Sequence, residues 1–235
     1  MKKIALALVL FMSGYVTKAQ WLLNFGTATT VQPRNFVFIS GTGAQFTRTK
    51  NPSTSNFTPF LAHAGLRTGL TSRMDIGYRL CNVPLPYNVA GPTLGSAMDV
   101  KFRVTPMVST WQCSIILGGG YAYVQLFGNG KSAWSPGGAV VASRALSKGK
   151  VLAFQARALQ TSIPTAVGGS AENYVNVFGG SAMLGFDLHP ALALLVEAGV
   201  FDMQGRVNAT TTNALGFQTG VVLKVDWKKL TTTKE

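Results

Sequence analysis

The sequence predicts an all-β protein: a transmembrane, antiparallel, up-and-down β-barrel of about ten strands, with eight or twelve strands as the alternatives. Three observations predict it. The chain opens with a secretory signal, the remainder alternates polar and apolar residues with the period of a β-strand, and the links between these runs alternate in length. The composition agrees, because 47% hydrophobic residues exclude a disordered chain and 12% charged residues is low for a soluble domain.

Residues 1–19 have the features of a cleaved signal peptide. Two lysines precede a mostly apolar stretch over residues 4–16, and an acceptable cleavage site ends at Ala19. The apolar stretch is short for a helix that spans a bilayer, so a membrane anchor is the less favoured alternative. We expect a mature chain beginning near Gln20, with residues 20–34 as a short periplasmic segment. The alternatives for that segment are a further strand pair or a place in the mouth of the barrel.

Strand alternation is clearest in two neighbouring runs. In residues 73–80 the charged side chains fall on one face and the bulky apolar ones on the other, and residues 98–104 repeat this pattern. Residues 35–227 are therefore the predicted barrel, and residues 228–235 a periplasmic tail. The expected strands are 35–47, 57–69, 73–83, 94–105, 110–125, 138–146, 150–162, 173–187, 190–203 and 214–227.

The links between these runs are short and long in turn. The longer ones are residues 47–57, 83–94, 126–137, 162–173 and 203–214. Membrane barrels have tight turns at one end and longer loops at the other. In lipid every backbone polar group needs a partner within the protein, and strands meet that need only by closing into a barrel. The apolar faces are then expected to meet lipid and the charged faces to line the lumen.

This rule assigns twelve charged residues, eight basic and four acidic, to the lumen: Arg67, Arg73, Asp75, Arg79, Asp99, Lys101, Arg103, Arg144, Arg157, Glu197, Lys224 and Asp226. Within the first hairpin we expect Arg67 opposite Asp75 as a cross-strand ion pair, and His63 opposite Arg79. Two interpretations stay open. The charges form a salt-bridge network that fills the interior, or they line a narrow, water-filled passage that favours anions.

Two segments carry a resemblance to a known family. Residues 65–77 resemble a hairpin common in small outer-membrane β-barrel proteins of Gram-negative bacteria. The C-terminal run is similar to their β-signal, with Val221, Leu223, Val225 and Trp227 at alternate positions. The resemblance implies secretion to the outer membrane, insertion by the barrel assembly machinery, and contact with lipid and lipopolysaccharide. One departure is that the chain continues past Trp227.

Three classes of function follow. The first is a structural or narrow-pore barrel with a slight anion preference. The second is a surface binding or adhesion protein that acts through the Ser/Thr/Asn-rich links 47–57 and 203–214. The third is an outer-membrane enzyme acting on lipid or peptide, for which His63, Asp202 and Glu172 are the available groups.

The sequence provides no spacing that makes a catalytic or metal site, and we assign no catalytic residue, metal ligand or cofactor. Cys81 and Cys113 are predicted on separated strands with opposite orientations, so we expect two free thiols. The formal charge of +13 comes from basic residues scattered along the strands. Nucleic-acid binding needs them grouped on one face, so we predict no nucleic-acid partner.

Overall fold

The computed structural model describes residues 26–50, 53–82, 94–126, 129–163, 173–207 and 210–232. Its ten strands are β1 (Phe36–Thr49), β2 (Thr54–Gly69), β3 (Met74–Asn82), β4 (Leu94–Arg103), β5 (Gln112–Leu126), β6 (Asn129–Ser147), β7 (Lys150–Ile163), β8 (Asn173–His189), β9 (Leu192–Val207) and β10 (Thr210–Asp226). A short helix, α2 (Trp227–Thr232), follows the last strand. Within the described part of the chain, no helix has the length and apolarity needed to cross a bilayer.

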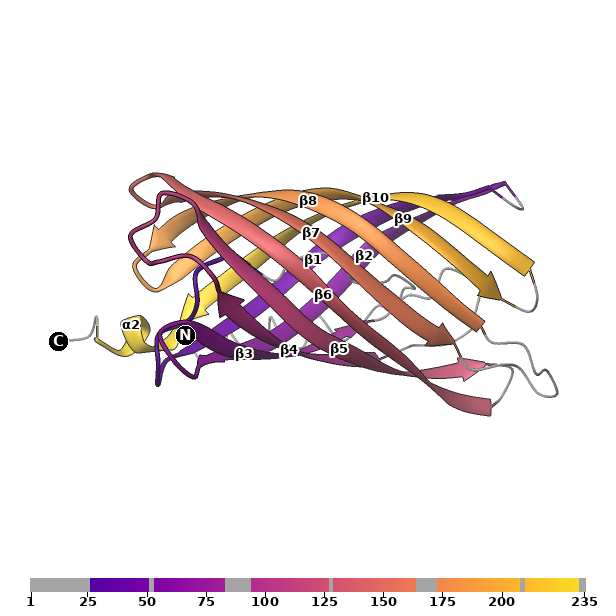
Figure 1. The fold of residues 1–235 in the computed structure, drawn as a ribbon, viewed down its shortest axis with the longest axis horizontal. Helices are drawn as coiled ribbons and strands as arrows, with labels where there is room; N and C mark the ends of the chain where they lie inside the picture. The colour runs from indigo at the N-terminus through magenta and orange to yellow at the C-terminus, as the bar shows by residue number, and fades with distance from the viewer. Residues whose placement is uncertain are drawn as a thin grey trace.

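The strands form one closed antiparallel barrel (Figure 1). Each strand pairs with its neighbours in sequence, and β1 closes the barrel on β10 in a register that runs from Val37 opposite Asp226 to Thr49 opposite Ala214. The predicted up-and-down barrel of ten strands is confirmed. Because the strand number is even, β1 begins where β10 ends, and Figure 1 shows the described N-terminus beside α2.

We name the two ends of the barrel by their connections. The turn end has the connections 70–73, 104–111, 148–149 and 190–191, together with both described termini. At the far end β1 meets β2 across residues 50–53, β5 meets β6 across 127–128, and β9 meets β10 across 208–209.

The expected long links 47–57, 126–137 and 203–214 are therefore wrong, because strands occupy most of them. Pairing continues out to Thr49 opposite Thr54 and to Thr210 opposite Val207. Beyond the hydrocarbon a strand needs no apolar face, so the alternation of hydropathy fades while the hydrogen-bonded ladder continues. Most of the other two long links, residues 83–93 and 164–172, lies outside the described residues.

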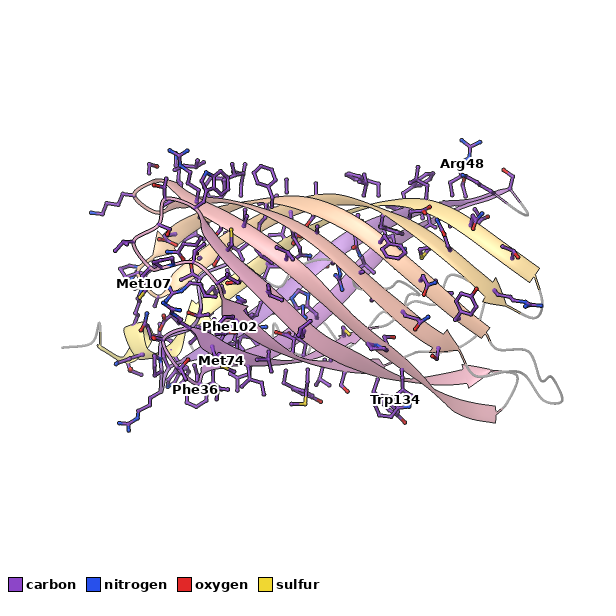
Figure 2. The ribbon with its side chains drawn as sticks, viewed as in Figure 1. Phe36, Arg48, Met74, Phe102, Met107 and Trp134 are labelled. Atoms are coloured by element: carbon purple, nitrogen blue, oxygen red, sulfur yellow. The ribbon has the colours of Figure 1, made fainter. Side chains whose placement is uncertain are left out.

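The two faces of the strands have the predicted polarity where the alternation is sharp. Phe102 is 44% exposed on the outside, whereas Asp75 and Arg103 are 0% and 2% exposed inside the barrel. Figure 2 shows Phe36, Met74 and Phe102 on the outer surface near the turn end. Apolar side chains thus surround the barrel and ionic ones are enclosed, which is the reverse of a soluble β-sandwich.

Large aromatic side chains are exposed outside at both ends. Trp111 and Trp227 lie near the turn end, 38% and 60% exposed. Near the far end, Tyr121 and Trp134 pack edge to face with ring centroids 4.9 Å apart, and Trp134 is marked in Figure 2. Aromatic side chains of this kind favour the two interfaces of a bilayer. Trp111, Trp227, Tyr121 and Trp134 therefore lie where membrane barrels have their aromatic girdles.

Candidate functional site

The candidate site is the lumen, and its most polar part is a set of six charged residues on the inward faces of β2, β3 and β4. We call it the charged wall: Arg67, Asp75, Arg79, Asp99, Lys101 and Arg103. The guanidinium of Arg67 pairs with the carboxylates of both Asp75 and Asp99. Arg79 Nη2 lies 3.2 Å from Asp99 Oδ2. Four side chains from three strands are therefore held in one ion-pair network across the wall.

The register explains how Arg67 reaches two carboxylates. Arg67 lies directly opposite Gly77, and Gly77 lies opposite Asp99 on the next strand. A Cβ at Gly77 would be 2.5 Å from Arg67 Nη2, so only glycine lets the guanidinium pass over β3. Asp75 is the diagonal neighbour of Arg67, a position that a long side chain can reach.

The predicted pairing in this hairpin is thus partly wrong. The ion pair between Arg67 and Asp75 is confirmed, but the two residues are not opposite each other. The turn centres on Ser72, one residue later than expected, and this shifts the register by two residues. His63 consequently lies opposite Cys81 and not opposite Arg79.

Residues 26–35 form a segment at the turn end that we call the N-terminal plug, and its first part, residues 26–31, lies inside the barrel. Ala28 is fully buried, and its backbone N–H donates to Ser143 Oγ at 3.1 Å. The hydroxyl of Ser114 donates to the carbonyl of Ala28. β5 and β6 provide these two hydroxyls, and Ser114 lies directly opposite Arg103, so the plug is bound along the strands next to the charged wall.

The charged wall also holds the plug. Lys101 Nζ donates to the carbonyls of Thr27 and Thr29 at 2.9 and 3.4 Å. The backbone N–H of Val31 donates to Asp75 Oδ2 at 2.8 Å. Asp75 therefore accepts from both Arg67 and the plug, which couples the ion-pair network to the plug.

Gly69 marks the place where the plug leaves the lumen. It bridges Pro33, and a Cβ at Gly69 would be 2.2 Å from the carbonyl oxygen of Gln32. No side chain fits between the two backbones. Arg34, at φ 61°, then makes the left-handed turn that leads into β1.

The inward faces of β6 to β9 differ in character. They bury mostly apolar side chains, and we call them the apolar wall: Ala139, Val141, Ala153, Val175, Val177, Met183, Leu195, Phe201 and Met203. Arg157 and Glu197 are the charged residues on these faces among those predicted, and the hydroxyl of Ser181 donates to Glu197. The expectation of a polar lumen is wrong for this half of the barrel.

Two cavities lie on either side of the ion-pair network. The turn-end cavity has a volume of ≈ 550 Å³, and Arg67, Lys101 and Lys224 are among its lining residues. The inner cavity is ≈ 100 Å³ and is lined in part by Arg79, Asp99 and Arg157. The ion-pair network lies between these two cavities, which share none of their lining residues.

Two of the twelve lumen assignments are wrong. Arg73 is exposed in the turn before β3, because the strand begins one residue later. Arg144 is exposed on the outer face of β6, since its neighbour Ser143 is the inward residue that binds the plug. The inward Val141 and the outward Val140 of β6 are both apolar, so no change in polarity marked the inward face.

The other ten assigned residues lie in the lumen or at its rim. Asp226 is at the turn-end rim, where Asn35 Nδ2 donates to its carboxylate at 3.0 Å. The ten residues are six basic, namely Arg67, Arg79, Lys101, Arg103, Arg157 and Lys224, and four acidic, namely Asp75, Asp99, Glu197 and Asp226. These ten residues therefore carry an excess of two positive charges, where the sequence predicted an excess of four.

The structure does not bring the enzyme candidates together. His63 is 3% exposed inside the lumen. Asp202 is on the outer face of β9, between the exposed Phe178 and Leu215 on the two neighbouring strands. Glu172 lies outside the described residues. Within the described ranges, no group of three or more His, Cys, Asp or Glu is placed to hold a metal ion.

The remaining predictions concern the cysteines and the C-terminal run. Cys81 and Cys113 are both free thiols, as expected. Val221 and Trp227 are exposed on the outside, 42% and 60%. The expected tail 228–235 begins with helix α2.

Sequence reasoning gave a place in the mouth of the barrel only as an alternative for residues 20–34, and it missed the apolar wall. The signal for the plug was weak, because residues 26–35 contain small and polar residues without alternation. Proline at position 33 and glycine at position 26 were the available hints of a non-strand segment.

Comparison with known proteins agrees with this architecture. No protein-family model matches the sequence, and no curated protein matches it. Among solved structures, the outer-membrane protease OmpT from Escherichia coli is similar with a TM-score of 0.52 and 10% identity, over 86% of this chain and 100% of that chain. The chain has the fold of Gram-negative outer-membrane β-barrels. Neisserial surface protein A has a TM-score of 0.40 at 10% identity, over 82% of this chain and 97% of that chain.

Proposed function

We propose that this protein is an outer-membrane β-barrel with a structural role, whose lumen is closed by its own N-terminal plug and ion-pair network. A narrow passage with a slight preference for anions opens only when the plug leaves the lumen. The closed barrel, its apolar outer face and its aromatic side chains at both ends support a place in a membrane. The signal peptide expected over residues 1–19 supports secretion to the outer membrane.

The observation that carries the proposal is the binding of the plug to four consecutive strands inside the turn end. Asp75 and Lys101 hold it from β3 and β4, and Ser114 and Ser143 hold it from β5 and β6. An ordered backbone with these partners blocks the turn end more fully than side chains alone. The excess of two positive charges among the ten lumen residues supports anion preference once the path is open.

Planar-bilayer recording tests the proposal. We expect the wild-type barrel to show no steady conductance, and a variant that lacks residues 26–33 to form small, anion-selective channels. A second variant keeps the plug in place by a disulfide between Ala28→Cys and Ser143→Cys, in a background with Cys81→Ser and Cys113→Ser. This variant should show no steady conductance when oxidised and, like the wild type, none when reduced, because the plug stays in the lumen in both states.

The control is the Cys81→Ser, Cys113→Ser background, which should match the wild type with and without reductant. Each variant is first checked for a closed barrel by the shift in gel mobility on boiling. Steady wild-type conductance that deletion of the plug leaves unchanged would contradict the proposal. Cation selectivity of the deletion variant would contradict the proposed anion preference but not the proposed closure of the lumen by the plug.

The partners proposed for this barrel are lipid, lipopolysaccharide and the barrel assembly machinery. Arg48 and Arg206 are exposed near the far end, where guanidinium groups suit lipid phosphates. Val221 on β10 and Trp227 at the start of α2 are two residues of the proposed β-signal, and both are exposed on the outside. The adhesion hypothesis loses its basis in the links 47–57 and 203–214, because these are mostly strand.

A further inference from the structure

The turn-end cavity has the size and position of a ligand site. Its volume of ≈ 550 Å³ falls within the range of about 300–1,000 Å³ that is typical of small-molecule pockets. Its lining includes Met107 and Gly149 from two turns, and Met107 is 51% exposed. The cavity therefore reaches the rim of the barrel, and a solute can enter beside the plug. The inner cavity, at ≈ 100 Å³, is too small for more than a few atoms.

Two ammonium groups give this cavity its charge. Lys101 donates to the backbone carbonyls of Thr27 and Thr29 and lies directly opposite Asp75, whose carboxylate is already shared by Arg67 and the plug. Lys224, on β10, forms no hydrogen bond or ion pair with any residue of the described ranges. Arg67 at the inner limit is different, because two carboxylates already pair with it.

One acidic residue also lines the cavity. Asp187 is exposed at the rim, and Lys150 lines the same rim. These two opposite charges offset each other near water, where their interactions are weak. The deeper lysines therefore decide which charge of ligand is favoured.

The rest of the lining is aliphatic. Val37, Ile39 and Leu195 come from β1 and β9, and Val37 and Leu195 are nearly fully buried. Ala193 lies directly opposite Lys224 in the register of β9 and β10, so its small side chain leaves space beside the ammonium group. A cavity with aliphatic walls and a few convergent polar groups is the usual form of a site for an amphiphilic molecule.

We infer that the turn-end cavity binds a small organic anion, a carboxylate or phosphate that carries an aliphatic chain. The head group lies against Lys224 and Lys101, and the chain lies along Val37, Ile39 and Leu195. This site goes beyond the proposed function, since a closed barrel needs no ligand. Its test does not measure conductance, so either conclusion can fail without the other.

Calorimetry on the mature protein in nanodiscs tests the site with three probes: octanoate, octyl phosphate and octanol. Empty nanodiscs correct for partition of the probes into lipid. We expect saturable binding of octanoate or octyl phosphate at one site per barrel, and the tighter of the two identifies the head group. Octanol should bind at least about tenfold more weakly, because a charge-assisted hydrogen bond contributes on the order of 1.5–3 kcal/mol.

Lys224→Gln should weaken binding of the charged probe about tenfold or more. Its matched control is Lys148→Gln, which removes the same charge from an exposed turn at the same end, outside the cavity lining. The control should leave the dissociation constant unchanged. Lys101→Gln does not separate ligand binding from plug binding, because Lys101 also holds the plug.

A second pair of variants tests the cavity by volume. Ala193→Phe fills the space beside Lys224, whereas Ala198→Phe adds the same bulk to the exposed face of the same strand. We expect the first variant to abolish binding and the second to retain it, with both showing the mobility shift of a folded barrel. Probe uptake no greater than that of empty nanodiscs would overturn the site, and so would binding that Lys224→Gln and Ala193→Phe both leave unchanged.

Discussion

The charged wall and the apolar wall enclose the same lumen in different ways. On β2 to β4 the enclosed side chains are ionic, and Arg67, Arg79, Asp75 and Asp99 satisfy one another. On β6 to β9 the enclosed side chains are mostly aliphatic, and no ion pair is needed to hold them. The inside of this barrel is therefore part salt-bridge network and part hydrophobic core.

The difference teaches that lipid on the outside does not impose polarity on the inside. An apolar outer face is required along every strand, because lipid surrounds the whole barrel. The inner face has only to be filled and hydrogen-bonded, and either an ion-pair network or close-packed aliphatic side chains meet that requirement. The two walls should consequently respond differently to substitution.

The largest effect is expected where a charge of the network is removed. Asp75→Asn deletes the carboxylate that accepts from both Arg67 and the plug, and leaves a buried guanidinium with less compensation. Loss of one partner of a buried ion pair costs about 3–5 kcal/mol. Urea unfolding in detergent micelles, followed by gel mobility, measures the free energy of unfolding.

Asp202→Asn is the control for this prediction, because Asp202 lies on the outer face with Gln204 as its hydrogen-bond partner. It should cost less than about 1 kcal/mol. A further variant that replaces both partners, Arg67→Met with Asp75→Leu, makes this part of the charged wall resemble the apolar wall. It should be more stable than Asp75→Asn alone, and equal losses in the two variants would contradict the network.

A smaller effect is expected from Gly77→Ala. The added Cβ would be 2.5 Å from Arg67 Nη2, so the guanidinium must move away from the two carboxylates that hold it. Overpacking of this kind costs about 1–3 kcal/mol. Gly120→Ala is the matched control, since its Cβ meets no atom closer than 3.5 Å, and the same unfolding measurement should show less than about 0.5 kcal/mol.

The two walls also explain how much of the structure the sequence could predict. Around Asp75 and Asp99 the charged and apolar faces differ sharply, and both strands and their inward faces were assigned correctly. In β6 the inward Val141 and the outward Val140 are chemically alike, so the period was visible but not which face was inward. Arg144 was placed inside for that reason.

The plug had no such signal. Its residues are ordered by partners that are distant in the sequence, such as Ser143, which is 115 residues from Ala28. Neither local propensity nor periodicity contains that information. The register of the first hairpin failed on a different point, because one residue in the position of the turn centre displaces every cross-strand pair by two residues.

Two neighbouring isoleucines of β5, the strand next to the apolar wall, test how closely the lumen is packed. Ile116 is fully buried in the lumen beside Val141, whereas Ile115 is 43% exposed on the outer face. Ile116→Val removes one buried methyl group and should cost about 0.5–1.5 kcal/mol. Ile115→Val faces the detergent or lipid chains, which refill the space, so its cost should be close to zero. Equal costs would show that the lumen is not close-packed here.

The smallest effect is expected from Arg144→Gln. Arg144 is exposed on the outer face near the turn end, where its long side chain can extend toward the water interface. The free energy of unfolding should change by no more than about 0.5 kcal/mol. Arg103→Gln provides the contrast, because Arg103 is 2% exposed and its Nη2 donates to the carbonyl of Ser72 at 2.9 Å. A large loss for Arg144→Gln with little for Arg103→Gln would reverse the assignment of the two faces.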